Sequence, residues 1–231
     1  MDNARDRVRR LAGDYVQRDD PTGWFEPLYA EAAGDASLIP WADLVPNPAF
    51  TEWADRIGFK GSGGSALVVG CGLGDDAEEL RRRGWRVTAF DISPTAIAWC
   101  RRRFPDSGVQ YVESDLLKPP REWRGAFDFA LETYTLQALP TGLRTRAIEE
   151  VASFIRPGGS LLVISRGRRP EEPDAGPPWP LLREEFDRFL ESGLKEDGFE
   201  EFMDSESPPV RRFRACYRRK YEDSSPASLK R

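Results

Sequence analysis

The sequence predicts an α/β fold built on a doubly wound, mostly parallel sheet. Three observations predict it. Short apolar runs alternate with helix-like segments at regular intervals between residues 66 and 166. A glycine-rich turn, GCGLG, follows the first of these runs. The 231 residues are enough for one such domain with a modest extension and a sizeable core.

Residues 1–60 are expected to form an N-terminal helical and aromatic cap. Residues 2–18 have the charged amphipathic pattern of a helix. The stretch that follows is dense in proline and aromatic residues and too apolar for a linker, so it should be ordered. Its aromatic residues are Trp24, Phe25, Tyr29 and Trp41. Residues 58–65, rich in glycine and serine, are expected to be a flexible joint into the main domain.

The main domain is expected over residues 61–221. Strands are predicted at 66–69, within 85–93, within 109–117, at 127–134 and at 159–166. Helices are predicted at 76–83, 93–104 and 142–155, with Pro157 and Gly158 ending the last of them. After an insertion at 166–180, a helix (181–193) and a closing antiparallel hairpin (199–205 with 210–221) are expected, which completes a seven-stranded sheet. Residues 222–231 are expected to be a disordered tail.

Composition excludes several classes of function. With 34 basic and 39 acidic residues the net charge is −5, which argues against general nucleic-acid binding. The three cysteines are widely separated and histidine is absent, so we expect no metal site and no imidazole base. No apolar run reaches the length of a signal-peptide core or a membrane span. We therefore expect a cytoplasmic protein with no membrane partner, and favour a monomer.

The residues around the glycine-rich turn indicate which ligand it holds. Gly70, Gly72 and Gly74 are followed at once by Asp75 and Asp76. Carboxylates at that position would repel a pyrophosphate, whereas they would tolerate a cationic or zwitterionic ligand. A dinucleotide such as NAD, or no ligand at all, is the alternative interpretation.

Two further acids end the second and third strands. Asp91 can accept hydrogen bonds from both hydroxyls of a ribose, and Asp115 can reach the amino group of an adenine. Ile92 and Leu116, next to them in sequence, can pack on the two faces of the base.

Taken together, the stretches VVGCGLG, AFDIS, SDLL and RPGGSLLVI resemble class I S-adenosylmethionine (SAM)-dependent methyltransferases over roughly residues 60–165. The resemblance implies a Rossmann-like fold, SAM as cofactor and S-adenosylhomocysteine as product. Carried over motif by motif, it implies that the cofactor is bound by Gly70, Cys71, Gly72, Gly74, Asp75, Asp91, Ile92, Asp115 and Leu116.

One position departs from the class pattern. Most of these enzymes have an acidic residue two positions before the first glycine, where it orients the methionine end of SAM, and this chain has Val68. In lacking this acid, the first motif of the chain resembles that of the branch of thiopurine, thiol and halide methyltransferases. GWFEPLYAEA with IPWADLVPNP, FDFALETYTLQALPTGLR and DAGPPWPLLREEFDRFL resemble the cap, the stretch after strand four and the insertion of that branch. This resemblance implies that Trp24 and Trp41 contact the cofactor, and that the PW dipeptide containing Trp41 lies over it.

The carboxyl end of strand four offers candidates for catalysis. Glu132 could bind the methionine ammonium group or act as a base. Tyr134 could hydrogen-bond the substrate or hold the cofactor, or simply pack under the cap. Cys71 is expected to contact the cofactor through its backbone, and Cys100 to lie in the core.

Side chains farther along the chain could line the acceptor site. Arg166, Arg168 and Arg169 follow strand five and could bind an anionic substrate, or form a solvated loop. Trp179 in the insertion is another candidate lining residue.

Methyl transfer from a sulfonium is an in-line displacement, which depends on alignment and on exclusion of water. A soft nucleophile needs no strong base, and this agrees with the absence of histidine. The expected function is SAM-dependent methyl transfer to a small molecule, with a thiol, chalcogen or halide acceptor preferred. The alternatives are a small-molecule O- or N-methyltransferase of a secondary-metabolite pathway and a non-catalytic SAM-binding domain.

Overall fold

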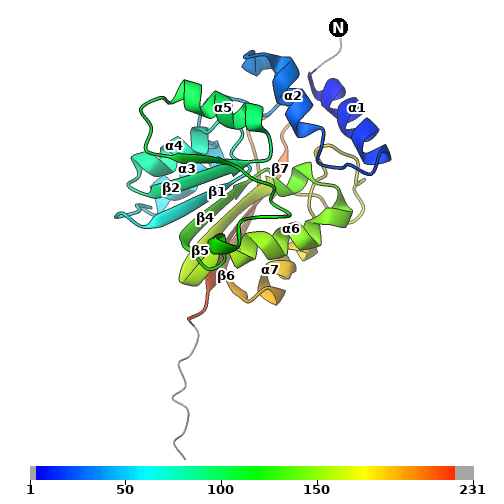
Figure 1. Cartoon of the computed structure of the whole chain (residues 1–231). Helices are drawn as coiled ribbons and strands as arrows, with labels where there is room; N and C mark the ends of the chain where they lie inside the picture. The colour runs from blue at the N-terminus through cyan, green and yellow to red at the C-terminus, as the bar shows by residue number, and fades with distance from the viewer. Residues whose placement is uncertain (1–3, 222–231) are drawn as a thin grey trace, which may run out of the picture.

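Seven strands form one sheet in the order β3-β2-β1-β4-β5-β7-β6 (Figure 1). The computed structural model describes residues 4–221. The strands are β1 (Ser65–Val69), β2 (Arg86–Asp91), β3 (Gln110–Glu113), β4 (Phe127–Thr133), β5 (Ile155–Arg166), β6 (Leu194–Met203) and β7 (Arg211–Arg219). The first five run parallel, and β7 runs antiparallel to both β5 and β6. This confirms the predicted fold class, including the closing hairpin.

Helices cover both faces of the sheet. On one face α3 (Pro48–Arg56), α4 (Asp75–Arg82) and α5 (Pro94–Arg103) pack in a core that includes Phe50, Leu80, Ile97 and Phe129. On the other face lie α6 (Thr141–Ser153) and the short α7 (Asp187–Glu191), as Figure 1 shows. Both faces of the central strands are therefore buried, which explains their continuous apolar sequences.

A third apolar cluster holds the N-terminal cap. The helices α1 (Ala4–Gln17) and α2 (Phe25–Ala32) lie over one end of the sheet (Figure 1). Trp24 and Leu28 of this cap pack with Leu73 of the glycine-rich turn and Trp99 of α5. Glu26 adds polar anchors, because its carboxylate accepts hydrogen bonds from the side chains of Ser93 and Thr95 at 2.5 and 2.6 Å. The cap is thus fastened to the two segments that follow β1 and β2.

The register of the parallel strands brings their carboxyl ends to one edge. Val69 of β1 lies opposite Phe90 of β2 and Glu132 of β4. The residues that come next on each strand therefore meet at the edge that the cap covers, where doubly wound sheets bind their ligands.

Two regions of the chain differ from the prediction. α6 ends at Ser153, and β5 starts at Ile155, so Pro157 and Gly158 lie inside the strand. Ile155 pairs with Phe127 before an irregularity in the β4–β5 register, which accommodates the proline. β6 starts at Leu194 rather than 199, because it pairs with the whole length of β7, and this leaves only a 3₁₀ turn (Arg183–Phe186) and α7 in the region predicted as one helix.

Two further expectations concern the ends of the chain and membranes. The predicted disordered tail, residues 222–231, lies outside the described residues. Between residues 4 and 221, no helix is both long and apolar enough to cross a bilayer.

Candidate active site

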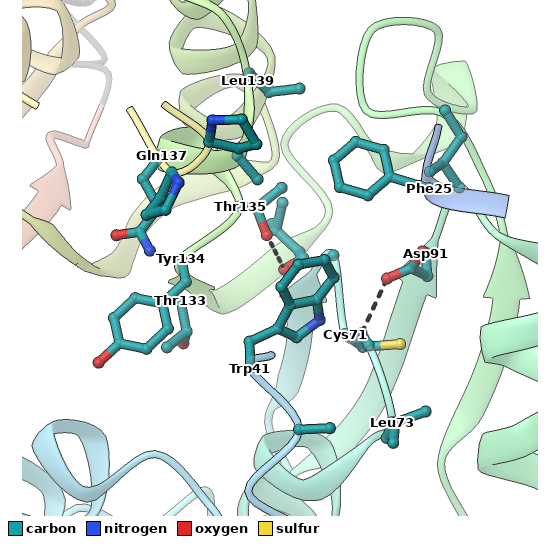
Figure 2. Close-up of a pocket in the computed structure, with 18 of the residues that line it drawn as sticks. Phe25, Trp41, Cys71, Leu73, Asp91, Thr133, Tyr134, Thr135, Gln137 and Leu139 are labelled. Carbon is teal, nitrogen blue, oxygen red and sulfur yellow. Dashed lines mark hydrogen bonds between the residues drawn. The ribbon is translucent and has the colours of Figure 1, made fainter. Parts of the chain in front are cut away.

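A cavity of about 430 Å³ lies between the cap and the carboxyl ends of β1, β2 and β4. Figure 2 shows Asp91 and Phe25 at one end, Thr133, Tyr134 and Gln137 at the other, and Trp41 between them. These side chains come from the cap and from several strand ends. The cavity is therefore enclosed by the cap together with the edge of the sheet.

The glycine-rich turn forms the floor of the cavity. Gly70 and Gly72 have φ of 58° and 52°, which favour glycine. A Cβ at Gly70 would lie 2.2 Å from the Thr135 hydroxyl oxygen, so no other residue fits there without movement. At Gly72 a Cβ would lie 3.3 Å from the Tyr29 hydroxyl, which shows how closely the cap approaches this turn.

Asp91 lies at the end of β2 and lines the cavity, as do its predicted companions Ile92, Asp115 and Leu116. Its carboxylate accepts hydrogen bonds from the backbone N–H groups of Gly72 at 2.9 Å and Ser93 at 3.0 Å. Burial raises the pKa of Asp91 to about 6, against the lowering effect of these donors. The strand end thus fixes this carboxylate beside the glycine-rich turn.

Asp75 and Asp76, adjacent in sequence, have different environments. Both carboxylate oxygens of Asp75 accept hydrogen bonds from Arg103 at 2.8 Å, so the charge of Asp75 is compensated within the protein. Asp76 accepts one hydrogen bond, at 2.7 Å, from the backbone N–H of Asn47 in the cap. Burial raises its pKa to about 6, opposed by that N–H and by the nearby Thr133 hydroxyl. Asp76 lines the same cavity as Val68.

Glu132 is not placed as expected. It is fully buried and does not line the cavity, whereas Thr133, Tyr134 and Thr135 do. One oxygen accepts hydrogen bonds from the backbone N–H groups of Thr135 and Leu136, at 2.8 and 2.9 Å. Burial raises the pKa of Glu132 to about 7. One oxygen of the carboxylate thus holds the turn after β4, while Oε2 is buried with no hydrogen-bond partner among the described residues. The expected contact of Glu132 with cofactor or substrate stays a prediction.

Tyr134 lies where predicted, at the cavity wall, with a left-handed φ of 67°. The guanidinium of Arg212 lies over its ring, 4.6 Å from the centroid. Burial raises the pKa of the Tyr134 phenol, although the positive charge of Arg212 opposes this. The group is consequently a neutral phenol that can donate a hydrogen bond.

Four of the five candidate aromatic residues line the cavity: Trp24, Phe25, Tyr29 and Trp41. Trp41 donates a hydrogen bond from its indole nitrogen to the Tyr29 hydroxyl at 3.0 Å and meets Trp24 edge to face. Trp179 does not line the cavity; it packs against the apolar cluster of the cap, and the neighbouring Pro177 and Pro178 line the cavity.

Among the candidate cysteines and the three arginines after β5, some line the cavity and others do not. Cys71 lines the cavity, and Cys100 lies in the core, where its thiol donates to the Gly72 carbonyl. Of the three candidate arginines only Arg166 lines the cavity. Arg168 contacts Glu172 and Asp174 in the insertion instead.

Sequence reasoning missed several lining residues, above all Arg212, Gln137 and Asn47. Arg212 lies in β7, directly opposite Arg166 of β5. The alternating sequence around Arg212 indicated a strand with one buried face, but it did not indicate which strand β7 would pair with. No local motif could have found this pair.

Comparisons with known proteins agree with this geometry. A family model described as a methyltransferase domain matches residues 66–159. A probable thiol methyltransferase from Arabidopsis thaliana is 24% identical over 192 residues, which cover 82% of this chain and 79% of that protein. A ubiquinone biosynthesis O-methyltransferase from Xanthomonas axonopodis pv. citri is 33% identical over 126 residues, covering 54% of this chain and 52% of that one. The structure of the N-methyltransferase NodS from Bradyrhizobium japonicum, in complex with S-adenosylhomocysteine, matches with a TM-score of 0.63 and 22% identity, covering 84% of this chain and 97% of NodS.

The strand order, the cavity at the glycine-rich turn and the domain matched over residues 66–159 are typical of a class I SAM-dependent methyltransferase. These similarities identify the chain as a methyltransferase and support SAM as its cofactor.

Proposed function

We propose that this methyltransferase acts on a small molecule with a soft nucleophile, a thiol, chalcogen or halide being preferred. The supporting observation is the chemistry of the cavity end farthest from Asp91. The lining residues there are Thr133, Tyr134, Gln137, Arg166, Glu206 and Arg212. Tyr134 has a raised pKa, and Glu206 is paired with Arg212 at 2.5 Å. None of these groups is a strong base near neutral pH, and a thiolate or halide needs none.

The similarity to a probable thiol methyltransferase points the same way. It extends over 82% of the chain and therefore beyond the methyltransferase domain. The similarity to the O-methyltransferase covers 54% of the chain.

The cofactor end of the cavity supports a binding mode. Bound SAM supplies a methyl group on a cationic sulfonium. We assign Asp91 to the ribose hydroxyls and Asp115, Ile92 and Leu116 to the adenine. The backbone of the glycine-rich turn can approach the methionine end closely, because Gly70 and Gly72 have no side chains. The aromatic face of Trp41 can lie against the sulfonium.

Asp76 is our candidate for the group that replaces the missing acid at Val68. It is held from the cap by Asn47 and lies in the same cavity, in the first turn of α4. Its carboxylate can pair with the methionine ammonium group, whose positive charge would compensate the cost of burying the carboxylate.

An acceptor screen tests the proposed function. The protein would be incubated with methyl-labelled SAM and matched thiols, halides, phenols and amines, and products would be detected by mass spectrometry. Methylated thiols or halides are expected, and Asp91→Ala should reduce their yield at limiting SAM. Methylation of phenols or amines alone would contradict the soft-nucleophile assignment. SAM binding without any product would favour a non-catalytic SAM-binding domain.

A second candidate function is O- or N-methylation. The raised pKa of Asp76, about 6, is suited to a general base near neutral pH. Asp76→Asn separates the two roles. Loss of SAM affinity with kcat preserved at saturating SAM supports the ammonium contact, whereas loss of kcat with SAM affinity preserved supports the base.

A further inference from the structure

Two arginines on neighbouring strands share one end of the cavity. Arg166 of β5 and Arg212 of β7 are directly paired in the antiparallel register, so their side chains leave the sheet on the same face. Both line the cavity. Burial lowers the pKa of Arg166, and the positive charge of Arg212 lowers it further. Placing two like charges opposite each other in a partly buried site is costly unless an anion compensates them.

The two carboxylates near this arginine pair form their shortest hydrogen bonds with Arg212. Arg212 donates to Asp204 at 2.7 Å and to Glu206 at 2.5 Å, both in the β6–β7 connection. The second oxygen of Glu206 lies 3.1 Å from Arg5 and 3.4 Å from Arg166. That long contact is the one ion pair that Arg166 makes within residues 4–221. One carboxylate is therefore divided among three guanidinium groups.

Other donors of this wall surround the same space. Gln137 accepts a 2.5 Å hydrogen bond from the backbone N–H of Arg166, which leaves its NH₂ group as a donor. That NH₂ group donates to no residue that the structure describes. Tyr134, next to Gln137 in Figure 2, has a phenol whose pKa is raised. Within the described chain, the Nη1 atom of Arg212 is buried and has no hydrogen-bond partner. The wall is thus rich in donors and poor in acceptors.

We propose that the methyl acceptor carries a carboxylate, and that Arg166 binds it with the help of Gln137 and the charge of Arg212. This inference rests on the proposed methyl transfer to a small molecule and names the class of acceptor. A planar guanidinium can hold a carboxylate through two parallel hydrogen bonds, which would fix the acceptor in orientation as well as in position. The nucleophilic atom would then face Trp41 and the sulfonium, while the carboxylate stays at the β5–β7 wall.

The test uses matched acceptors that differ only in charge. 2-Mercaptobenzoate would be compared with 2-mercaptobenzamide, and 3-mercaptopropionate with its amide. We expect kcat/KM of the wild-type protein to be at least about 10-fold higher for the carboxylates, in line with the strength of charge-assisted hydrogen bonds. Arg166→Met should abolish this preference by raising KM for the carboxylates about 10-fold or more, with little change for the amides and in SAM affinity.

Arg169→Met is the matched control. Arg169 is an exposed arginine of the same segment and does not line the cavity, so the preference should persist. Arg166→Lys keeps the charge but loses the planar fork, and an intermediate preference is expected. It also serves as the test variant if Arg166→Met does not fold.

Two results would overturn the inference. The first is that the wild-type protein has equal kcat/KM for the carboxylate acceptors and their amides. The other is a loss in Arg166→Met that appears as weaker SAM binding and affects both acceptors equally, because Arg166 would then hold the methionine carboxylate.

If the proposed methyl transfer is wrong, the carboxylate site can still be tested by ligand binding. If no acceptor is methylated, calorimetry would compare benzoate and benzamide binding to the complex with S-adenosylhomocysteine. Charge-selective binding that Arg166→Met removes would support the carboxylate site alone. Absence of such selectivity would overturn it.

Discussion

At the scale of single residues, the environment of each carboxylate decides what it can do. The turn after β1 and the ends of β2 and β4 carry Asp75, Asp76, Asp91 and Glu132. Arg103 compensates Asp75, and two backbone N–H groups hold Glu132 away from the cavity. Asp76 and Asp91 line the cavity and have pKa values raised to about 6 by burial. These two are therefore our candidates for contacts to a cationic, ribose-containing cofactor.

Asp91→Ala should weaken SAM binding by about 1.5–3 kcal/mol, because charge-assisted hydrogen bonds to the ribose would be lost. Calorimetric titration with SAM measures the change. Asp197→Ala, which removes a carboxylate from the distant β6, is the control and should bind SAM normally. Unchanged affinity in Asp91→Ala would remove this residue from the binding site.

At the scale of elements, the turn after β4 and the cap are each held by polar contacts that are buried or partly buried. Glu132 closes the turn into the 3₁₀ segment Leu136–Ala138. Within the cap, Trp41 donates a hydrogen bond to Tyr29, whose hydroxyl lies close to Gly72 of the glycine-rich turn.

Glu132→Ala should lower the free energy of unfolding by about 1–3 kcal/mol, because two backbone N–H groups at the start of the turn lose their acceptor. Urea-induced unfolding measures this loss. Glu132→Gln keeps an acceptor oxygen and should be destabilised less. If Glu132→Gln is as stable as the wild type but has lost nearly all kcat, Glu132 acts in catalysis and our structural assignment is wrong.

Trp41→Ala should reduce SAM affinity, because the aromatic side of the cavity between the cap and the glycine-rich turn is removed. The expected loss is about 1–2 kcal/mol if the indole faces the sulfonium. Leu44→Ala, another exposed apolar residue of the cap that does not line the cavity, is the control. Full activity and affinity in Trp41→Ala would contradict the contact.

At the scale of the whole molecule, the raised carboxyl pKa values couple cofactor binding to pH. Asp76 and Asp91 have an ordinary pKa of 3.8 and a pKa of about 6 in the folded protein. Their contribution to folding is present below about pH 4 and is lost as the pH rises through 6, because burial disfavours the charged form. A cationic ligand prefers the ionised carboxylates and offsets this loss.

SAM affinity should therefore increase between pH 5 and pH 7, and the rise in Tm caused by a fixed SAM concentration should be larger at pH 7. Calorimetry and thermal unfolding over this interval measure both effects. Asp76→Asn should flatten the pH dependence in part, because the Asp91 carboxyl still titrates. A pH-independent affinity in the wild-type protein would show that neither carboxylate pairs with the cofactor.

Local patterns predicted most of the fold. Strand and helix positions followed from apolar periodicity, and the errors fell at Ile155 and Leu194, where pairing with β4 and β7 extends each strand. The candidates Asp91 and Asp115 line the cavity because they are tied to the ends of β2 and β3, and their contacts with the cofactor stay predictions. Glu132 lies at the end of β4 as expected, but its carboxylate accepts hydrogen bonds from the turn after β4, a contact that the local pattern does not encode.

The sequence by itself indicated the class of the protein, because the glycine-rich turn and the strand-end acids are short-range motifs whose resemblance to class I methyltransferases can be seen without a structure. Tertiary structure decided the acceptor end of the cavity. Arg166 and Arg212 lie 46 positions apart in sequence and become neighbours only through the antiparallel β5–β7 pairing. Asp76 likewise meets the cap only through Asn47. Such contacts arise from the packing of distant segments, which no local pattern encodes.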